Sequence, residues 1–112
     1  MKLPYAAGRV VPPRKVAGYL LDRQHVRGGP KAAFFERFGF SADAPGLLTA
    51  ALHTHPERND VVETVFGPYG TSYVVRCAIE TPDGRNPCIL SVWFAPHGDP
   101  TKPRLSTAYP AS

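Results

Sequence analysis

Residues 61–110 read VVETVFGPYGTSYVVRCAIETPDGRNPCILSVWFAPHGDPTKPRLSTAYP, and this half of the chain decides the fold. Its apolar residues are mainly β-branched or aromatic, and they stand in short runs between turns that contain glycine and proline. Such runs are typical of strands in an antiparallel sheet. The pattern predicts four strands, over residues 61–66, 72–80, 88–95 and 104–109.

The turn Thr81-Pro82-Asp83-Gly84 sets the expected register between the second and third strands. If Pro82 opposes Arg85, one face holds opposed pairs that are apolar or nearly so: Tyr73–Phe94, Val75–Val92, Cys77–Leu90 and Ile79–Cys88. We expect this face to be the core face. The other face then holds the remaining pairs: Val74–Trp93, Arg76–Ser91 and Ala78–Ile89. In this register the two cysteines are reduced, buried and diagonal to each other, which disfavours a disulfide between them.

The first half of the chain has helical periodicity instead. Proline suits the first turn of a helix and glycine suits its end, so three helices are expected. They cover about residues 13–21, residues 30–39, and a third stretch that begins near residues 41–45 and is ended by Pro56. An extended arm with a short strand at residues 9–11 precedes them. The sequence therefore predicts one α+β domain, residues 1–112, with about three N-terminal helices packed on a four-stranded antiparallel sheet.

Composition narrows the class of protein. The chain has 112 residues, of which 43% are hydrophobic and 20% charged, as expected for one folded domain. Its net charge of +4 attracts phosphate groups and acidic partners. No apolar run approaches the roughly 20 residues of a membrane span, so we expect a cytoplasmic protein without a membrane partner. Two cysteines form neither a disulfide framework nor a metal site, and we expect no metal or other cofactor.

Five segments spread over residues 2–110 resemble a bacterial family of short uncharacterised proteins, found alone or as C-terminal domains of toxin-like proteins: KLPYAAGRVVPPRKVAGYLL, HVRGGPKAAFFERFGF, GPYGTSYVV, TPDGRNPCILSVWF and PRLSTAYP. The helices-then-sheet order and the closing TAYP strand also resemble, more remotely, the barnase–EndoU–colicin–RelE group of RNase toxins. That resemblance implies RNA cleavage on the sheet face without a metal. Family members often have basic or histidine residues beside a lysine, as in R-H-K-A-R, and here only Lys31 is present in that stretch.

Lys31 is the first candidate catalytic residue, because it falls in the first turn of the expected second helix. The helix macrodipole is positive there, so a cation costs roughly 0.3–1 kcal/mol, and a bound anion would offset this cost. His25 lies in the same part of the chain and is the best histidine candidate for proton transfer during RNA cleavage. The alternative for Lys31 is a solvated surface lysine.

Hydroxyl groups in the family-like motifs YGT and TAYP supply three further catalytic candidates: Thr71, Thr107 and Tyr109. Such groups can orient the 2′-OH of RNA or stabilise a phosphorane. The alternative is structural, with Thr71 at the exit of a turn and Tyr109 as an anchor for the C-terminus.

Four residues are candidates for RNA binding: Arg27, Arg76, Trp93 and Arg104. Arg27 lies close to Lys31 in sequence, Arg104 lies on the last strand, and Arg76 shares the expected non-core face with Trp93. A basic face with one exposed tryptophan can bind a phosphodiester and stack a base. The alternative is that Trp93 packs beneath the N-terminal arm.

Two functional hypotheses follow. The first is a metal-independent endoribonuclease toxin domain that cleaves RNA through a 2′,3′-cyclic phosphate, with a small acidic antitoxin or immunity protein as its partner. The second is a non-catalytic protein-interaction module, such as an immunity or adaptor protein. A neighbouring gene for a small acidic protein would favour the first.

The charge pattern predicts RNA binding that weakens steeply with salt. About four phosphate contacts, from Arg27, Lys31, Arg76 and Arg104, imply a slope near −3 when log K is plotted against log salt for a single strand. Fluorescence anisotropy of a labelled oligoribonucleotide over a salt series measures this slope. Binding that is independent of salt would favour the interaction module.

Overall fold

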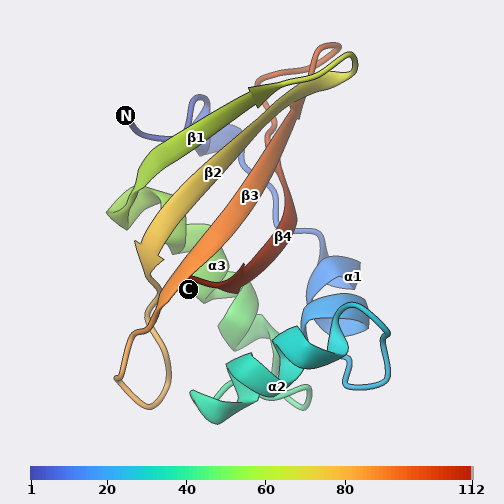
Figure 1. Ribbon diagram of the computed structural model, residues 1–112, viewed down its shortest axis with the longest axis vertical. Coiled ribbons are helices and arrows are strands. Elements are labelled where there is room, and N and C mark those ends of the chain that lie inside the picture. The colour runs from blue at the N-terminus through green and yellow to red at the C-terminus, as the bar shows by residue number, and fades with distance from the viewer. Residues whose placement is uncertain (112) are drawn as a thin grey trace.

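The four expected strands form one antiparallel sheet in the computed structural model of the chain, which describes residues 1–111 (Figure 1). The strands follow one another in the order β1 (Asp60–Phe66), β2 (Gly70–Ala78), β3 (Cys88–Pro96) and β4 (Arg104–Pro110). Each begins and ends within two residues of the bounds expected from the turns. The predicted α+β class and the four-stranded antiparallel sheet are confirmed.

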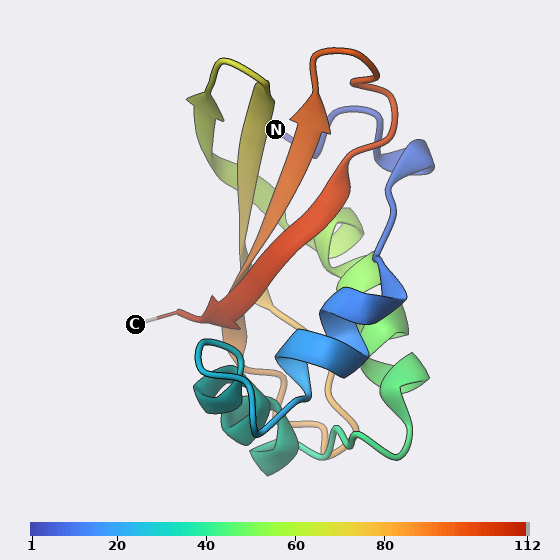
Figure 2. The same ribbon diagram turned by 90° about the vertical axis from the view of Figure 1, so that its right-hand side faces the viewer.

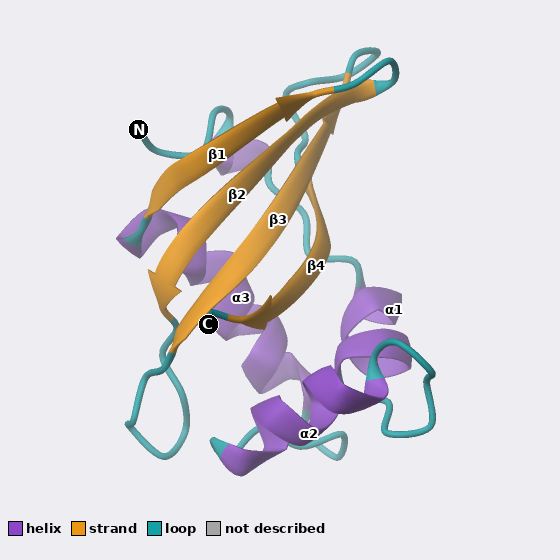
Figure 3. Cartoon of the chain, viewed as in Figure 1, coloured by secondary structure: helices purple, strands orange, loops and turns teal. Residues whose placement is uncertain are grey.

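Helices occupy the first half of the chain, as expected (Figure 3). A turn of 3-10 helix, η1 (Ala6–Gly8), precedes α1 (Pro13–Lys15), which continues directly as a π-helical turn, η2 (Val16–Leu20). Then come α2 (Gly29–Arg37) and α3 (Pro45–Arg58), both with a proline in the first turn. None of the described helices is long and apolar enough to cross a membrane.

Pro56 does not end α3, contrary to expectation. The helix continues through Pro56 to Arg58. Proline removes one backbone hydrogen bond at this position, but both His55 and Pro56 are fully buried, and this packing holds the last turn in place. The Asn59 side chain also donates to the His55 carbonyl at 3.0 Å, which satisfies one of the exposed carbonyls at the helix end.

The helices cover only one face of the sheet (Figures 1 and 2). Helix α3 lies behind the sheet, while α1, η2 and α2 gather near the lower end of β4. The hydrophobic core lies between these layers, and its largest fully buried side chains include Trp93, Phe35, Leu20, Leu48 and Leu52. Within residues 1–111 the opposite face of the sheet carries no helix, and we refer to it as the open face.

The observed register of β2 and β3 differs from the expected one by one residue. Tyr73 pairs with Trp93, and Cys77 pairs with Ile89. The expected core face of β3 is therefore wrong: Ile89, Ser91 and Trp93 point to the core and are fully buried. The connection permits this register, because it is a loop over residues 79–87 rather than a two-residue turn, and the Ile79 N–H donates to the Pro87 carbonyl at 3.0 Å across the base of the loop.

The two cysteines are unbridged, but the expectation that both are buried is wrong. Cys77 is exposed and Cys88 is half-buried. Cys77 has a φ of 141°, a backbone conformation that residues with a side chain rarely adopt. This irregularity interrupts the alternation of β2, so Val75 and Ile79 face the core while Cys77, between them, faces solvent.

His55 and Ser91 form a buried polar chain that explains this register. The indole N–H of Trp93 donates to Ser91 Oγ at 2.9 Å. Ser91 Oγ lies 2.8 Å from His55 Nδ1, and His55 Nε2 lies 2.7 Å from the Cys77 carbonyl oxygen. Because a carbonyl only accepts, Nε2 carries the proton and Nδ1 accepts the serine hydroxyl. Every group has a partner only when His55 is neutral.

The N-terminal arm runs beside β4, the strand at one edge of the sheet, and pairs with its first residue. Val10 forms a parallel bridge to Arg104, with the Val10 N–H donating to the Pro103 carbonyl at 2.8 Å and the Leu105 N–H to the Val10 carbonyl at 2.9 Å. The expected strand in the arm is thus a single bridge. This bridge holds α1 next to the start of β4.

The stability of the fold should fall below pH 6.5 because of His55. Burial holds the pKa of His55 below its ordinary 6.5, and the hydrogen bond to the Cys77 carbonyl offsets this only in part. Below pH 6.5, His55 therefore binds a proton in the unfolded chain more readily than in the folded chain. The stabilisation is complete above pH 6.5 and is lost progressively below it, by at most about 1.4 kcal/mol per pH unit.

Urea unfolding followed by circular dichroism, at about pH 7.5 and about pH 5.5, measures this loss. The His55→Gln variant should be less stable at the higher pH but should lose less on acidification. The other three histidines are present in both proteins and cancel in the comparison. An equal pH dependence in both proteins would rule out His55 as the cause.

Candidate functional site

A tyrosine, a lysine and a threonine from three separate elements meet at the edge of the open face. Lys31, in the first turn of α2, donates through Nζ to the phenol oxygen of Tyr19 on η2. The same nitrogen donates to Thr107 Oγ1 on β4 at 2.9 Å. We call these three residues the Tyr19 cluster. The alternative of a fully solvated Lys31 is wrong, because this side chain is half-buried and engaged in both contacts.

The Tyr19 cluster retains unused hydrogen-bond donors. A lysine ammonium has three N–H groups, and the contacts to Tyr19 and Thr107 occupy two of them. Tyr109 lies two positions after Thr107 on β4, on the same face, and its ring centroid is 5.9 Å from Lys31 Nζ. The remaining N–H and the hydroxyl groups together suit an anion with several oxygens, such as a phosphodiester.

Tyr19 has a perturbed phenol. Partial burial raises its pKa, but the hydrogen bonds to Lys31 and Thr107 and the charges of Lys31 and Lys15 outweigh burial and bring the pKa below the ordinary 10.0. The two ammonium nitrogens lie 4.6 and 5.2 Å from the centroid of its ring. A phenol held in this way is a better proton-transfer group at neutral pH than a free tyrosine.

His25 packs against the other side of Tyr19. The two rings meet edge to face, with centroids 4.9 Å apart. His25 Nδ1 accepts the backbone N–H groups of Arg27 and Gly28 at 3.1 and 3.0 Å. The ring proton therefore lies on Nε2, so His25 in this arrangement offers a hydrogen-bond donor.

Gly28 allows this loop to close on Tyr19. A Cβ atom at position 28 would lie 2.0 Å from the Tyr19 carbonyl oxygen, a distance that no side chain tolerates. Glycine at this position therefore brings both His25 and the start of α2, with Lys31, against the phenol ring.

Two further predicted residues share the open face with the Tyr19 cluster. Leu90 on β3 is opposed by Arg76 on one side and by Tyr109 on the other, so these three side chains form a row across the face. Phe94 is likewise opposed by Arg104, whose guanidinium carbon lies 5.6 Å from the phenyl centroid. Both arginines are exposed. The expected basic sheet face therefore exists, although in a different register.

Three predicted residues lie elsewhere. Trp93 is 0% exposed in the core, so its expected exposure on the RNA-binding face is wrong. Thr71 opposes Ala95, three positions along β2 from the row that contains Thr107, or roughly 10 Å. Arg27 is exposed in the loop before α2, and its backbone N–H, rather than its side chain, contacts His25. Thr71 and Trp93 are therefore not part of the site that we propose below.

The sequence analysis missed Tyr19. The helical spacing of Val16, Tyr19 and Leu20 assigned it to the core, and its ring does pack partly against the core. The available signal was chemical, since a tyrosine on a core stripe needs a partner for its hydroxyl group.

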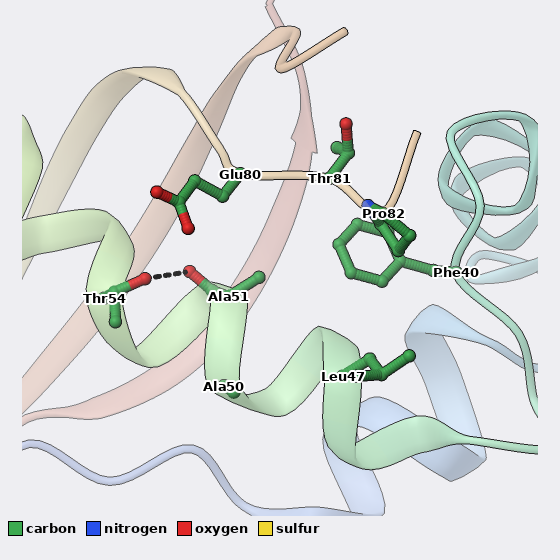
Figure 4. Close-up of a pocket in the computed structure, with 8 residues that line it drawn as sticks. All are labelled: Phe40, Leu47, Ala50, Ala51, Thr54, Glu80, Thr81 and Pro82. Carbon is green, nitrogen blue, oxygen red and sulfur yellow. Dashed lines mark hydrogen bonds between the residues drawn. The ribbon is translucent and has the colours of Figure 1, made fainter. Parts of the chain in front are cut away.

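A pocket of about 300 Å³ opens between α3 and the loop after β2 (Figure 4). The described residues that line it are mainly apolar, and the one charged side chain among them, Glu80, forms an ion pair with Arg58. The Thr54 hydroxyl on its wall donates to the Ala51 carbonyl at 3.1 Å. These polar groups of the pocket wall are thus paired within the protein.

These features define an α+β domain whose sheet leaves one basic face open beside a tyrosine–lysine cluster. The chain belongs to the family named "Domain of unknown function (DUF6883)", whose sequence profile matches residues 2–112. The expected membership of an uncharacterised family is thereby confirmed.

The fold is also similar to that of a chain in a solved structure, "Contact-dependent growth inhibition toxin - immunity protein complex from Klebsiella pneumoniae 342". The TM-score is 0.71 with 16% sequence identity, over 96% of this chain and 97% of that chain. Identity at this level shows a common fold. A comparison with curated proteins gives no match.

The cluster predicts an unusual alkaline titration. One of the five tyrosines of the wild type should ionise below the ordinary pH range of a phenol, and the Tyr19→Phe variant should lack this early step, as measured by the ultraviolet absorbance of tyrosinate. Lys31→Met should move this ionisation upward, because it removes a hydrogen bond and a positive charge from the phenolate. Arg37→Met, at the other end of α2, should leave the titration unchanged. Superimposable curves for the wild type and Lys31→Met would contradict the assignment.

Proposed function

We propose that this domain is a metal-independent endoribonuclease, acting as a toxin, that cleaves RNA through a 2′,3′-cyclic phosphate. The observation that carries the proposal is the contact of Lys31 with both Tyr19 and Thr107 at the edge of the open face. It combines a cation, a phenol with a lowered pKa and neighbouring hydroxyl groups, which are the groups that this reaction needs.

The proposed reaction uses these groups in defined roles. The ionised fraction of Tyr19 takes the proton from the 2′-OH as the 2′-oxygen attacks phosphorus. The bond to the 5′-oxygen breaks, and water protonates the departing oxygen. Lys31 stabilises the negative charge of the phosphorane. Thr107 and Tyr109 orient the 2′-OH, and His25 donates a hydrogen bond to the phosphate through Nε2.

The distribution of charge supports a polyanionic substrate. Within residues 1–111, five of the thirteen basic side chains form ion pairs: Lys2, Arg9, Arg23, Arg58 and Arg85. The basic residues around the open face form none with the described carboxylates: Arg14, Lys15, Lys31, Arg76 and Arg104. Unpaired cations gathered on one face produce a positive potential that attracts RNA phosphates.

The partner follows from the same argument. A basic site that harms the cell that makes it calls for a small acidic immunity or antitoxin protein, and charge complementarity would speed the encounter. The fold likeness to a chain of a toxin–immunity protein complex supports this partner class.

A second function, a non-catalytic interaction module such as an immunity protein, is favoured by the tip of the β1–β2 hairpin. Phe66 and Tyr69 are 81% and 82% exposed there, as at many protein-binding surfaces. Induced expression in a bacterial cell, with and without the adjacent gene, separates the two functions. Growth arrest that the adjacent gene relieves supports the toxin.

Lys31→Ala should lower the rate of RNA cleavage by on the order of 10²-fold or more, because it removes the charge that stabilises the transition state. The variant should still fold: hydrogen bonds of a charged group contribute about 1.5–3 kcal/mol each, and removing a cation from the first turn of a helix offsets part of that loss. The assay follows a 5′-labelled RNA in the presence of EDTA and identifies 2′,3′-cyclic phosphate ends. Circular dichroism checks the fold.

Arg37→Ala is the matched control, because it removes a cation from the same helix at the end far from the Tyr19 cluster. It should cleave at the wild-type rate. The nuclease proposal fails if the wild type leaves RNA intact, or if Lys31→Ala cleaves as fast as the wild type. The interaction module then takes its place.

A further inference from the structure

A cleft of about 470 Å³ lies between the N-terminal arm and the sheet, beside the Tyr19 cluster but outside it. Its lining includes three cations, Arg14, Lys15 and Arg104, together with Phe94 and Ser106. We propose that this cleft binds a second phosphate group of a single-stranded RNA substrate, next to the phosphodiester held at the Tyr19 cluster. This inference rests on the proposed function and extends it to the substrate class.

The strand geometry makes the cleft and the cluster neighbouring sites. The pairing of β3 with β4 shifts between Val92 and Trp93, which leaves Ser106 as an extra residue on β4. A bulge of this kind redirects the side chains on both sides of it. Ser106 lines the cleft, whereas the next residue, Thr107, contacts Lys31. Consecutive residues of one strand thus serve two adjacent anion sites.

The charges of the two sites reinforce each other. Lys15 Nζ and Lys31 Nζ lie 5.2 and 4.6 Å from the centroid of the same Tyr19 ring. The two ammonium groups are therefore within about one Debye length, roughly 10 Å at 0.1 M salt, and repel each other when no anion is bound. Among the described carboxylates, none pairs with Arg14, Lys15 or Arg104 to relieve this repulsion. A ligand with two phosphates would relieve it at both sites.

The lining favours a single strand over a duplex. The Arg104 guanidinium stacks on Phe94 with a carbon-to-centroid distance of 5.6 Å, which fixes a planar donor group that can bind two phosphate oxygens at once. The volume of the cleft, about 470 Å³, falls within the roughly 300–1,000 Å³ of a small-ligand pocket. Basic grooves that contain aromatic residues are typical of single-strand binding.

The test uses the double variant Arg14→Gln/Arg104→Gln, which leaves the Tyr19 cluster intact. The matched control is Arg37→Gln/Arg58→Gln, which removes the same charge from residues outside the cleft. Binding is measured with a tetranucleotide whose 2′-oxygens are methylated, so that it cannot cyclise. Cleavage is measured with an unmodified tetranucleotide and with a dinucleotide, which has only the scissile phosphate.

We expect the cleft variant to bind the methylated tetranucleotide about tenfold or more weakly than the control, with a salt slope lower by about 1. It should cleave the tetranucleotide correspondingly more slowly at low substrate concentration, and the loss should be clearly smaller with the dinucleotide, which has no second phosphate for the cleft to bind. This pattern would establish the second phosphate site.

Other outcomes separate the two proposals. If the cleft variant binds and cleaves the tetranucleotide as the control does, the second site is overturned and the nuclease proposal stands. If the variant loses binding while the wild type cleaves neither substrate, the phosphate site stands and the nuclease proposal fails. If the variant handles RNA normally but no longer binds the product of the adjacent gene, the cleft takes acidic side chains of a protein, and the RNA inference is overturned.

Discussion

A buried chain of hydrogen bonds, from Trp93 through Ser91 and His55 to the Cys77 carbonyl, joins the helical layer to the sheet. A buried polar group without a partner costs about 1–3 kcal/mol. A slip of one residue between β2 and β3 would leave several groups of this chain without partners, so it would cost this amount more than once. The register that this chain selects turns Leu90 and Phe94 to the open face, which they share with Arg76. It also decides which residues of β4 oppose them. The position of Thr107 beside Lys31 thus follows from a contact in the core.

The sequence was sufficient for the elements and insufficient for their register. Turn residues separate the strands of the second half of the chain clearly, so the bounds of all four strands could be predicted within two residues. Both faces of β3 are largely apolar, however, with Leu90, Val92 and Phe94 on one side and Ile89 and Trp93 on the other. Alternation alone cannot choose between two such faces. The polar residue Ser91 suggested solvent, whereas its partner His55, 36 residues away in sequence, places it in the core.

The residues of the candidate site could likewise be predicted in part, but the contacts between them could not. Lys31, Thr107, Tyr109, Arg76 and Arg104 could be singled out from residue type, position in a helix and resemblance to a family. The pairing of Lys31 with Tyr19 could not, because both residues follow ordinary helical spacing and nothing local indicates that η2 and α2 meet at that point. The sequence could not show that Thr71 lies too far along β2 to reach Lys31, because that depends on how the strands pair. It could not show that Trp93 faces the core, because that depends on the register of β3.

Trp93 is the only tryptophan of the protein, and it is fully buried one hydrogen bond away from Ser91. Its fluorescence therefore arises from a single known site. Solvent that entered the layer between α3 and the sheet would shift the emission to longer wavelengths. A protonated imidazole close to the indole would quench it. The protein thus contains an intrinsic optical probe at the contact that sets its register, one that needs no label and lies away from the open face.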